Sequence, residues 1–177
     1  MDLEKLKYPI GQYNAPETLD MDIWNGWVAE IGQFPAEIRK LAEGLSEEEL
    51  AYRYRPEGWN IRQLIHHCSD SHMNALIRIK WVLTEDSPTI KAYNEAKWAE
   101  LPDTLELAPE VSLAQLEVIH VKIVHLLKGM KKEEWDRVFF HPEVKGALQI
   151  GKYMGLYAWH GNHHLAHIRQ ALEMKFS

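Results

Sequence analysis

Hydrophobic residues recur at helical spacing in four long stretches of the chain. In the first stretch, Ile23, Trp27, Ile31 and Phe34 follow one another at intervals of three and four residues, which places them on one face of an α-helix. Pro35 falls within this stretch, and a proline there should kink the helix or split it. Four helices are therefore predicted, over about Asp20–Glu43, Asn60–Thr84, Ser112–Lys128 and Leu148–Met174.

Two of these helices carry a capping-box pattern at the predicted N-terminus. Asn60 is followed three residues later by Gln63, and Ser112 is followed in the same way by Gln115. In this motif each side chain bonds the backbone N–H of the other residue, so the pattern marks a helix start. Gly129 comes directly after the third stretch and is a suitable C-terminal stop.

The remaining segments predict few regular elements. Residues 1–19 contain Pro9, Gly11 and Pro16, so we expect an extended segment lying over the rest of the fold. Only residues 137–141 look like a strand. The whole chain, 1–177, is therefore predicted to be one all-α domain, a four-helix bundle. Its connections are too long to guarantee an up-down-up-down order.

Composition and charge exclude several classes of protein. The 177 residues include 20 Lys and Arg against 26 Asp and Glu, a formal charge of −6, and no basic stripe offsets it, which argues against nucleic-acid binding. The apolar runs fall far short of the roughly 20 residues that span a bilayer. Cys68 is the only cysteine, and the first residues lack the features of a signal peptide. We therefore expect a cytoplasmic protein that acts on a small molecule.

The ten histidines are the residues most informative about chemistry, and they cluster in the second and fourth predicted helices. His160 and His164 are four residues apart beside the apolar stripe of the last helix, so both imidazoles can bind one metal ion. His163 and His167 have the same spacing but lie on a neighbouring strip of that helix. We therefore rank His160 and His164 first as metal ligands.

A third ligand has to come from a facing helix, and helical periodicity leaves two candidates open. His72 lies near the centre of the apolar stripe of the second helix, whereas His67 lies at its polar edge, which suits a cleft. His120 and His125, in the third helix, are five residues apart and are expected at the surface. His141 precedes Pro142, and we expect it in a solvated loop.

Several other side chains are weaker candidates for a role in the site. Asp70 could orient a ligating imidazole, although its helical position points away from the apolar stripe. Arg62 and Arg78 could meet an anionic group of the substrate, because arginine recognises carboxylates. Trp59 and Trp159 flank the histidine segments and could form the walls of a cleft.

Five segments of the chain also resemble a known family. They are Tyr-Pro-Ile-Gly-Gln-Tyr at 8–13, the Gly-Trp-Asn to His-His block at 58–67, Asp-Ser-His-Met-Asn at 70–74, Phe-His-Pro at 140–142, and 155–167. With them the sequence resembles the DinB superfamily of bacterial four-helix bundles, and within it the YfiT-type metal-dependent hydrolases, some of which act as bacillithiol transferases.

The resemblance implies a divalent metal held by one histidine of the second helix and two of the last. Matched position by position, these are His67, His160 and His164; it also implies a homodimer. Three imidazoles leave a coordination position open, as in catalytic zinc sites, and zinc and nickel both accept this ligand set. The ion could activate water, giving a hydrolase, or a low-molecular-weight thiol such as bacillithiol, giving a transferase. The alternative is a non-catalytic metal-binding or dimerising bundle, in which a fourth protein ligand would close the site.

Overall fold

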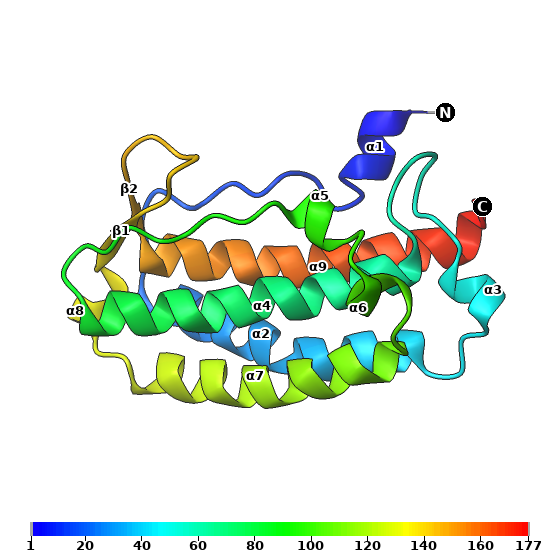
Figure 1. Cartoon of the computed structure of the whole chain (residues 1–177). Helices are drawn as coiled ribbons and strands as arrows, with labels where there is room; N and C mark the ends of the chain where they lie inside the picture. Colours follow the sequence, from blue (N-terminus) through cyan, green and yellow to red (C-terminus); the bar gives the residue numbers. More distant parts are fainter. Residues whose placement is uncertain (1, 177) are drawn as a thin grey trace.

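The computed structural model describes residues 2–176 and is built around four long helices (Figure 1). They confirm the predicted four-helix bundle and agree closely with the predicted ranges at most of their ends. The long helices are α2 (Met21–Ala42), α4 (Ile61–Thr84), α7 (Pro109–Gly129) and α9 (Ile150–Met174).

Short elements connect and cover the long helices. Two strands pair antiparallel, with Phe139 opposite Leu148, so the strand expected at 137–141 is present and has a partner that was not predicted. Five residues near the N-terminus form a helix, and there the expectation of a purely extended segment was wrong. The short elements are α1 (Leu3–Lys7), α3 (Glu47–Leu50), α5 (Glu95–Trp98), α6 (Pro102–Leu105), α8 (Lys132–Trp135), β1 (Val138–Phe140) and β2 (Ala147–Gln149).

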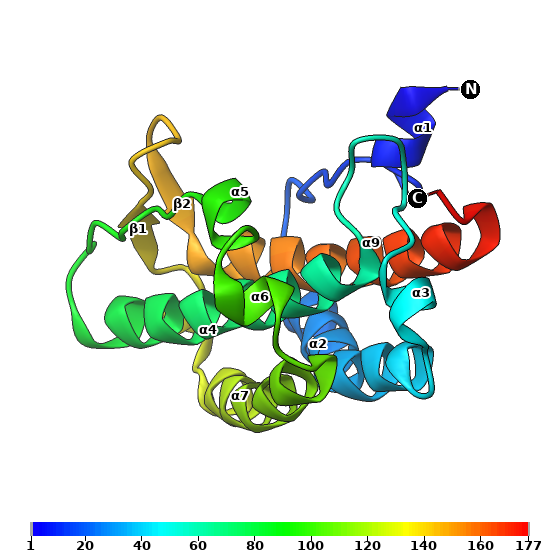
Figure 2. The ribbon, with the colours of Figure 1, turned by 45° about the vertical axis from the view of Figure 1, so that its right-hand side comes forward.

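The helices are not arranged in sequential order. α2 packs on α7 and α9, and α4 packs on the same two helices. In Figure 1, α4 and α7 run in one direction and α2 and α9 in the other. The long connection between α4 and α7, which carries α5 and α6, crosses back outside α4 (Figure 2). This crossover places α5 beside the histidine-bearing faces of α4 and α9.

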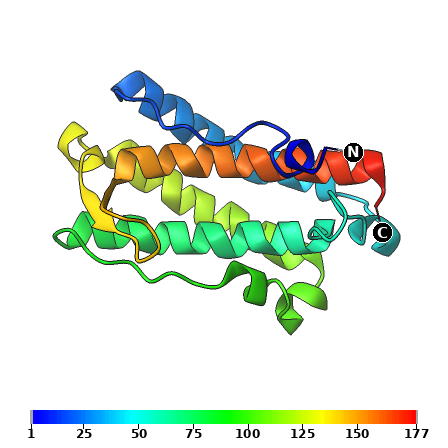
Figure 3. The same cartoon turned by 90° about the horizontal axis from the view of Figure 1, so that it is seen from above.

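The N-terminal segment lies along α9, as seen from above in Figure 3. The Tyr13 hydroxyl donates to the carbonyl of Lys152 at 2.8 Å, and the Trp159 indole N–H donates to the carbonyl of Gly11 at 3.2 Å. Gly155 allows this approach, because a Cβ atom there would lie 2.5 Å from the Tyr13 hydroxyl. The segment is therefore held on the helix that contributes two of the clustered histidines.

Helix ends agree with the sequence where a side-chain cap is present and differ where it is absent. Asn60 and Gln63 form the predicted capping box at the start of α4. The predicted start of α7 at Ser112 was wrong, because the helix begins three residues earlier, at Pro109. Proline is favourable in the first turn, since the backbone N–H that it lacks would have no partner within the helix there. The Ser112 hydroxyl is instead buried, 2.7 Å from Nδ1 of His66.

Pro35 does not divide α2, which continues through it as one helix. Because proline has no backbone N–H, the carbonyl of Ile31 lacks the donor that residue 35 would normally supply. The side chain of His120 donates to this carbonyl instead. No helix among residues 2–176 combines the length and apolar character required to cross a membrane.

Candidate metal centre

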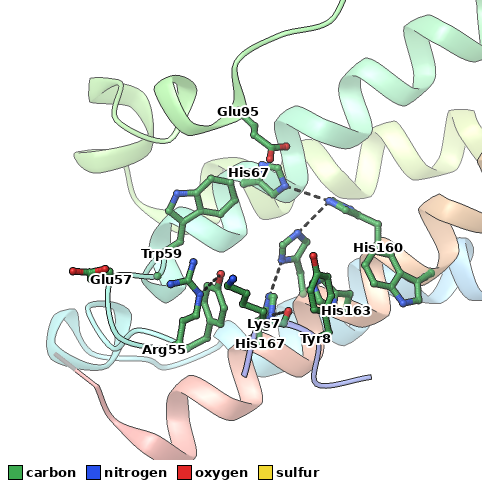
Figure 4. Close-up of a pocket in the computed structure, with 14 residues that line it drawn as sticks. Lys7, Tyr8, Arg55, Glu57, Trp59, His67, Glu95, His160, His163 and His167 are labelled. Atoms are coloured by element: carbon green, nitrogen blue, oxygen red, sulfur yellow. Dashed lines mark hydrogen bonds between the residues drawn. The ribbon is translucent and has the colours of Figure 1, made fainter. Parts of the chain in front are cut away.

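Three histidines from two antiparallel helices converge on one point (Figure 4). Nε2 of His67, on α4, lies 3.2 Å from Nε2 of His160, and Nε2 of His164 lies 3.1 Å from the same atom of His160. Each residue offers a ring nitrogen within 4.8 Å of the others. The pair on α9 is one helical turn apart, so a single backbone segment fixes two of the three rings.

Behind His160, a chain of hydrogen bonds leads into the core of the bundle. Nδ1 of His160 lies 3.4 Å from Nε2 of His72, and Nδ1 of His72 lies 2.7 Å from Nε2 of His120. The chain ends where Nδ1 of His120 donates to the carbonyl of Ile31 at 2.6 Å. That is the carbonyl left without its usual helical donor by Pro35. We call this set, from His160 to Ile31, the inner chain.

The inner chain determines which nitrogen of His160 carries the proton. A carbonyl can only accept, so Nδ1 of His120 is the protonated nitrogen and its Nε2 accepts. His72 must then donate from Nδ1 and accept at Nε2, and His160 must donate from Nδ1. Nε2 of a neutral His160 is therefore left with a free lone pair that faces His67 and His164.

A second chain does the same for His164. Nδ1 of His164 lies 3.3 Å from Nδ1 of His167, and Nε2 of His167 donates to the carbonyl of Lys7 at 3.0 Å. By the same argument, His164 donates from Nδ1 and keeps a lone pair on Nε2. We call this set, from His164 to Lys7, the outer chain, because it ends in the short N-terminal helix.

The surroundings keep these rings neutral. Burial lowers the pKa of His67 to about 4, and burial together with neighbouring imidazoles lowers the pKa values of His160 and His164 well below their usual range. Lone pairs of neutral imidazoles facing one another at about 3 Å repel unless a cation lies between them. The donor set and its protonation therefore fit a divalent metal ion.

The cluster opens on one side into a cavity of about 520 Å³. His160 is half-buried at its wall, whereas His67 and His164 are buried. Trp59 packs against the ring of His67, with centroids 4.6 Å apart, and Trp159 stacks on His163 at 4.3 Å. The ionisable groups that line this cavity besides histidines are Lys7, Tyr8, Tyr54, Arg55, Glu57 and Glu95.

Close packing of α2 on α9 supports the inner chain. A Cβ atom on Gly161 would lie 2.8 Å from the ring of Phe34, so only glycine lets that ring approach. Phe34 then stacks on His72, with ring centroids 5.0 Å apart. Gly161 directly follows His160, so the glycine that makes room for Phe34 lies next to the histidine whose ring is bonded by His72.

The structure separates the two histidines that periodicity left open. His67 joins the cluster, and His72 lies behind His160 as its hydrogen-bonding partner. The expectation that His120 lies at the surface was wrong, since it is only 2% exposed. The signal was present in the sequence, because His120 continues the apolar stripe of Leu116 and Ile123. His125 is exposed, as expected.

The weaker candidates lie outside the cluster. Among residues 2–176 no hydrogen bond joins the Asp70 carboxylate to His67, and burial raises the pKa of Asp70 to about 6. Arg62 pairs with Glu47 and donates to the carbonyl of Leu107. Arg78 is buried farther along α4. Glu95, which the sequence gave no reason to single out, lies on α5 at the cavity wall.

Comparisons with known proteins agree with this architecture. Residues 30–168 match the family model of the DinB superfamily. A protein of Bacillus cereus (strain 03BB102) named "Putative metal-dependent hydrolase" is 45% identical over 166 residues, 94% of this chain and 95% of its own length. A Bacillus anthracis protein of the same name is 44% identical over the same shares. The structure of YfiT from Bacillus subtilis superimposes on this chain with a TM-score of 0.93 and 37% sequence identity. The match covers 98% of this chain and 99% of YfiT, which is described as a probable metal-dependent hydrolase with an unusual four-helix bundle topology.

Proposed function

Because the chain belongs to the DinB superfamily, we propose that it is a metal-dependent hydrolase whose divalent ion is held by His67, His160 and His164. The observation that carries this proposal is the pair of hydrogen-bond chains that leave Nε2 of His160 and of His164 unprotonated. Zinc and nickel both accept three imidazoles and are the ions we propose. The open side of the cluster faces the cavity, so substrate can reach it.

A divalent ion at this position would supply a Lewis acid and lower the pKa of water toward neutrality. Glu95 lies at the wall of the same cavity, and partial loss of hydration there, together with the neighbouring Glu143, raises the pKa of its carboxyl. We propose that Glu95 accepts one proton from the attacking water. The water oxygen then bonds the electrophilic atom of the substrate, the bond to the leaving group breaks, and that group takes the proton from Glu95.

The metal assignment is tested by metal content and hydrolysis in matched variants. Protein purified without chelator or a His-tag should carry about one divalent ion per chain, and His160→Ala and His164→Ala should lose it. His163→Ala is the control, since His163 lines the same cavity outside the cluster and should keep its metal. Equal metal content in all four proteins would contradict the proposal.

The hydrolytic step is tested on a panel of esters and amides. Wild type should turn over at least one of them, and His160→Ala should lose the activity by about 100-fold or more, because it removes a metal ligand. Glu95→Gln should lose activity while keeping its metal. A Glu95→Gln protein as active as wild type would exclude the proposed proton acceptor.

Thiol transfer is a second candidate, favoured by the size of the cavity and by two cationic side chains at its wall. Its volume of about 520 Å³ suits a substrate larger than water, and the wall carries Lys7 and Arg55 as well as Glu57 and Glu95, so each cation can meet an anionic group of a thiol. An anionic low-molecular-weight thiol such as bacillithiol fits this chemistry. Thiol-dependent conversion of fosfomycin or monochlorobimane, without hydrolysis of the ester and amide panel, would favour transfer over hydrolysis.

A further inference from the structure

A smaller cavity adjoins the histidine cluster at His160. It has a volume of about 170 Å³ and shares His160 and Glu95 with the larger cavity. A water molecule occupies about 30 Å³ in the liquid, so this space holds a small functional group and a few further atoms. The side chains that line it include Arg78, Tyr93, His141, Tyr153 and Tyr157.

Arg78 is a buried cation with only uncharged partners. It is 5% exposed, and its Nη1 donates to the hydroxyls of Tyr153 and Tyr157, the latter at 3.5 Å. Its Nη2 donates to the carbonyl of Lys91 at 3.2 Å, and its Nε–H has no acceptor among residues 2–176. Within the same residues, no carboxylate lies within 4.0 Å of the guanidinium.

A buried charge without a counter-ion is unfavourable, and native proteins pair such charges or use them to bind a ligand. Arg62, on the same helix, shows the ordinary solution, an ion pair with Glu47 at the surface. Glu95 and Glu143 line the cavity of Arg78 but form no ion pair with it. The cation of Arg78 is therefore available to an anion that enters the cavity.

The cavity also lies at a useful distance from the histidine cluster. Tyr157 and Tyr153, which hold Arg78, are three and seven residues before His160 on α9. These spacings are about one and two helical turns, so the guanidinium is roughly 5–10 Å along the helix axis from the cluster. One small molecule can reach both places.

We propose that Arg78 and this cavity form a subsite for a carboxylate group of the substrate. The inference rests on the proposed function and adds the class of substrate, a small carboxylic acid whose carboxylate lies a few bonds from the bond that is cleaved. The planar fork of arginine matches a carboxylate, and the tyrosines hold the guanidinium in place for it.

The subsite is tested by binding of carboxylates and of their uncharged amides. Acetate, propionate and N-acetylglycine are each compared with acetamide, propionamide and N-acetylglycinamide by ligand-detected NMR and calorimetric titration. Wild type should bind at least one carboxylate about tenfold or more tightly than its amide, as expected for a charge-assisted hydrogen bond. Equal binding of acids and amides in all three pairs would overturn the proposal without any variant.

Variants identify the residue responsible. Arg78→Gln should reduce carboxylate affinity by about tenfold or more and leave amide binding unchanged. Arg78→Lys keeps the charge without the fork and should give an intermediate loss, which keeps the test decisive if Arg78→Gln does not fold. Lys80→Gln is the control, because it removes the same charge from the solvent-exposed side of α4. Unchanged carboxylate affinity in a folded Arg78 variant would overturn the proposal.

The titrations are run on metal-free and metal-loaded protein, so this proposal and the proposed function can fail separately. Carboxylate binding to the metal-free chain that depends on Arg78 supports the subsite even if the chain takes up no metal. Binding that requires added zinc or nickel but ignores Arg78→Gln would show that the carboxylate binds only the ion, and would overturn the subsite while supporting the metal site.

Discussion

The two hydrogen-bond chains behind the cluster achieve the same result in different surroundings. The inner chain runs through His72 and His120, which are 1% and 2% exposed, and ends on a carbonyl inside the bundle. The outer chain has one intermediate histidine, His167, which is also only 2% exposed but lines the larger cavity, and it ends on the carbonyl of Lys7 in a short helix at the surface. Both leave a lone pair on Nε2 of a clustered histidine.

The difference teaches how much of the site depends on the core. Water can replace the carbonyl of Lys7 as a partner for His167, so the outer chain can be interrupted with little effect on folding. In the inner chain the bond between His72 and His120 is buried, and breaking it leaves a buried nitrogen without a partner. We therefore expect the inner chain to couple metal binding to stability, and the outer chain to affect mainly metal binding.

The largest contrast should come from the same substitution in each chain. His72→Phe leaves Nε2 of His120 buried without a donor, so we expect the metal-free protein to lose about 1–3 kcal/mol of unfolding free energy. His167→Phe should lose less unfolding free energy, because the carbonyl of Lys7 that it leaves without a donor can bond water. Both variants should bind metal about 10- to 100-fold more weakly. Each removes the hydrogen-bond partner that keeps the proton of His160 or His164 on Nδ1 and leaves Nε2 free for the metal. Urea unfolding and competitive metal titration measure the two effects; equal stability losses would contradict the comparison.

The pH dependence of stability should identify His120 as a buried neutral group. Burial lowers its pKa to about 4 in the folded protein, against about 6.5 in the unfolded chain. The unfolded state therefore binds more protons between these values, and stability falls as the pH falls through this window. From about pH 7.5 to about pH 5, His120 alone should remove about 2 kcal/mol.

This contribution is measured as a difference between variants of the metal-free protein. His120→Gln should show a shallower loss of unfolding free energy over the same pH range, whereas His125→Gln, on the exposed side of the same helix, should follow wild type. If His120→Gln and wild type lose stability in parallel, His120 is not held neutral by burial.

The smallest predicted effect concerns the anchor of the inner chain. Pro35→Ala restores a backbone N–H that competes with His120 for the carbonyl of Ile31. We expect metal affinity to fall by up to about tenfold, with no loss of helix by circular dichroism. Pro102→Ala, at the start of α6, removes a proline that frees no carbonyl near the cluster and serves as the control. Unchanged metal affinity in Pro35→Ala would show that the carbonyl does not need its proline.

The sequence by itself determined the four helices and the pairing of His160 with His164. Both follow from local rules: apolar residues at intervals of three and four define a buried face, and residues one turn apart share it. The start of α4 was equally predictable, because Asn60 and Gln63 satisfy each other without help from the rest of the fold. Pro35 was correctly located in α2, but it does not split the helix.

Only the tertiary structure decided which distant residues meet that pair. Periodicity could not choose between His67 and His72, because both face inward from α4 and the packing of α4 on α7 and α9 decides which of them meets the pair. The same holds for His120, which reaches the site because α7 packs on both α2 and α4, and for the carbonyl of Lys7. A sequence specifies the faces of its helices through short-range spacing, whereas the partners of those faces depend on packing between elements far apart in the chain.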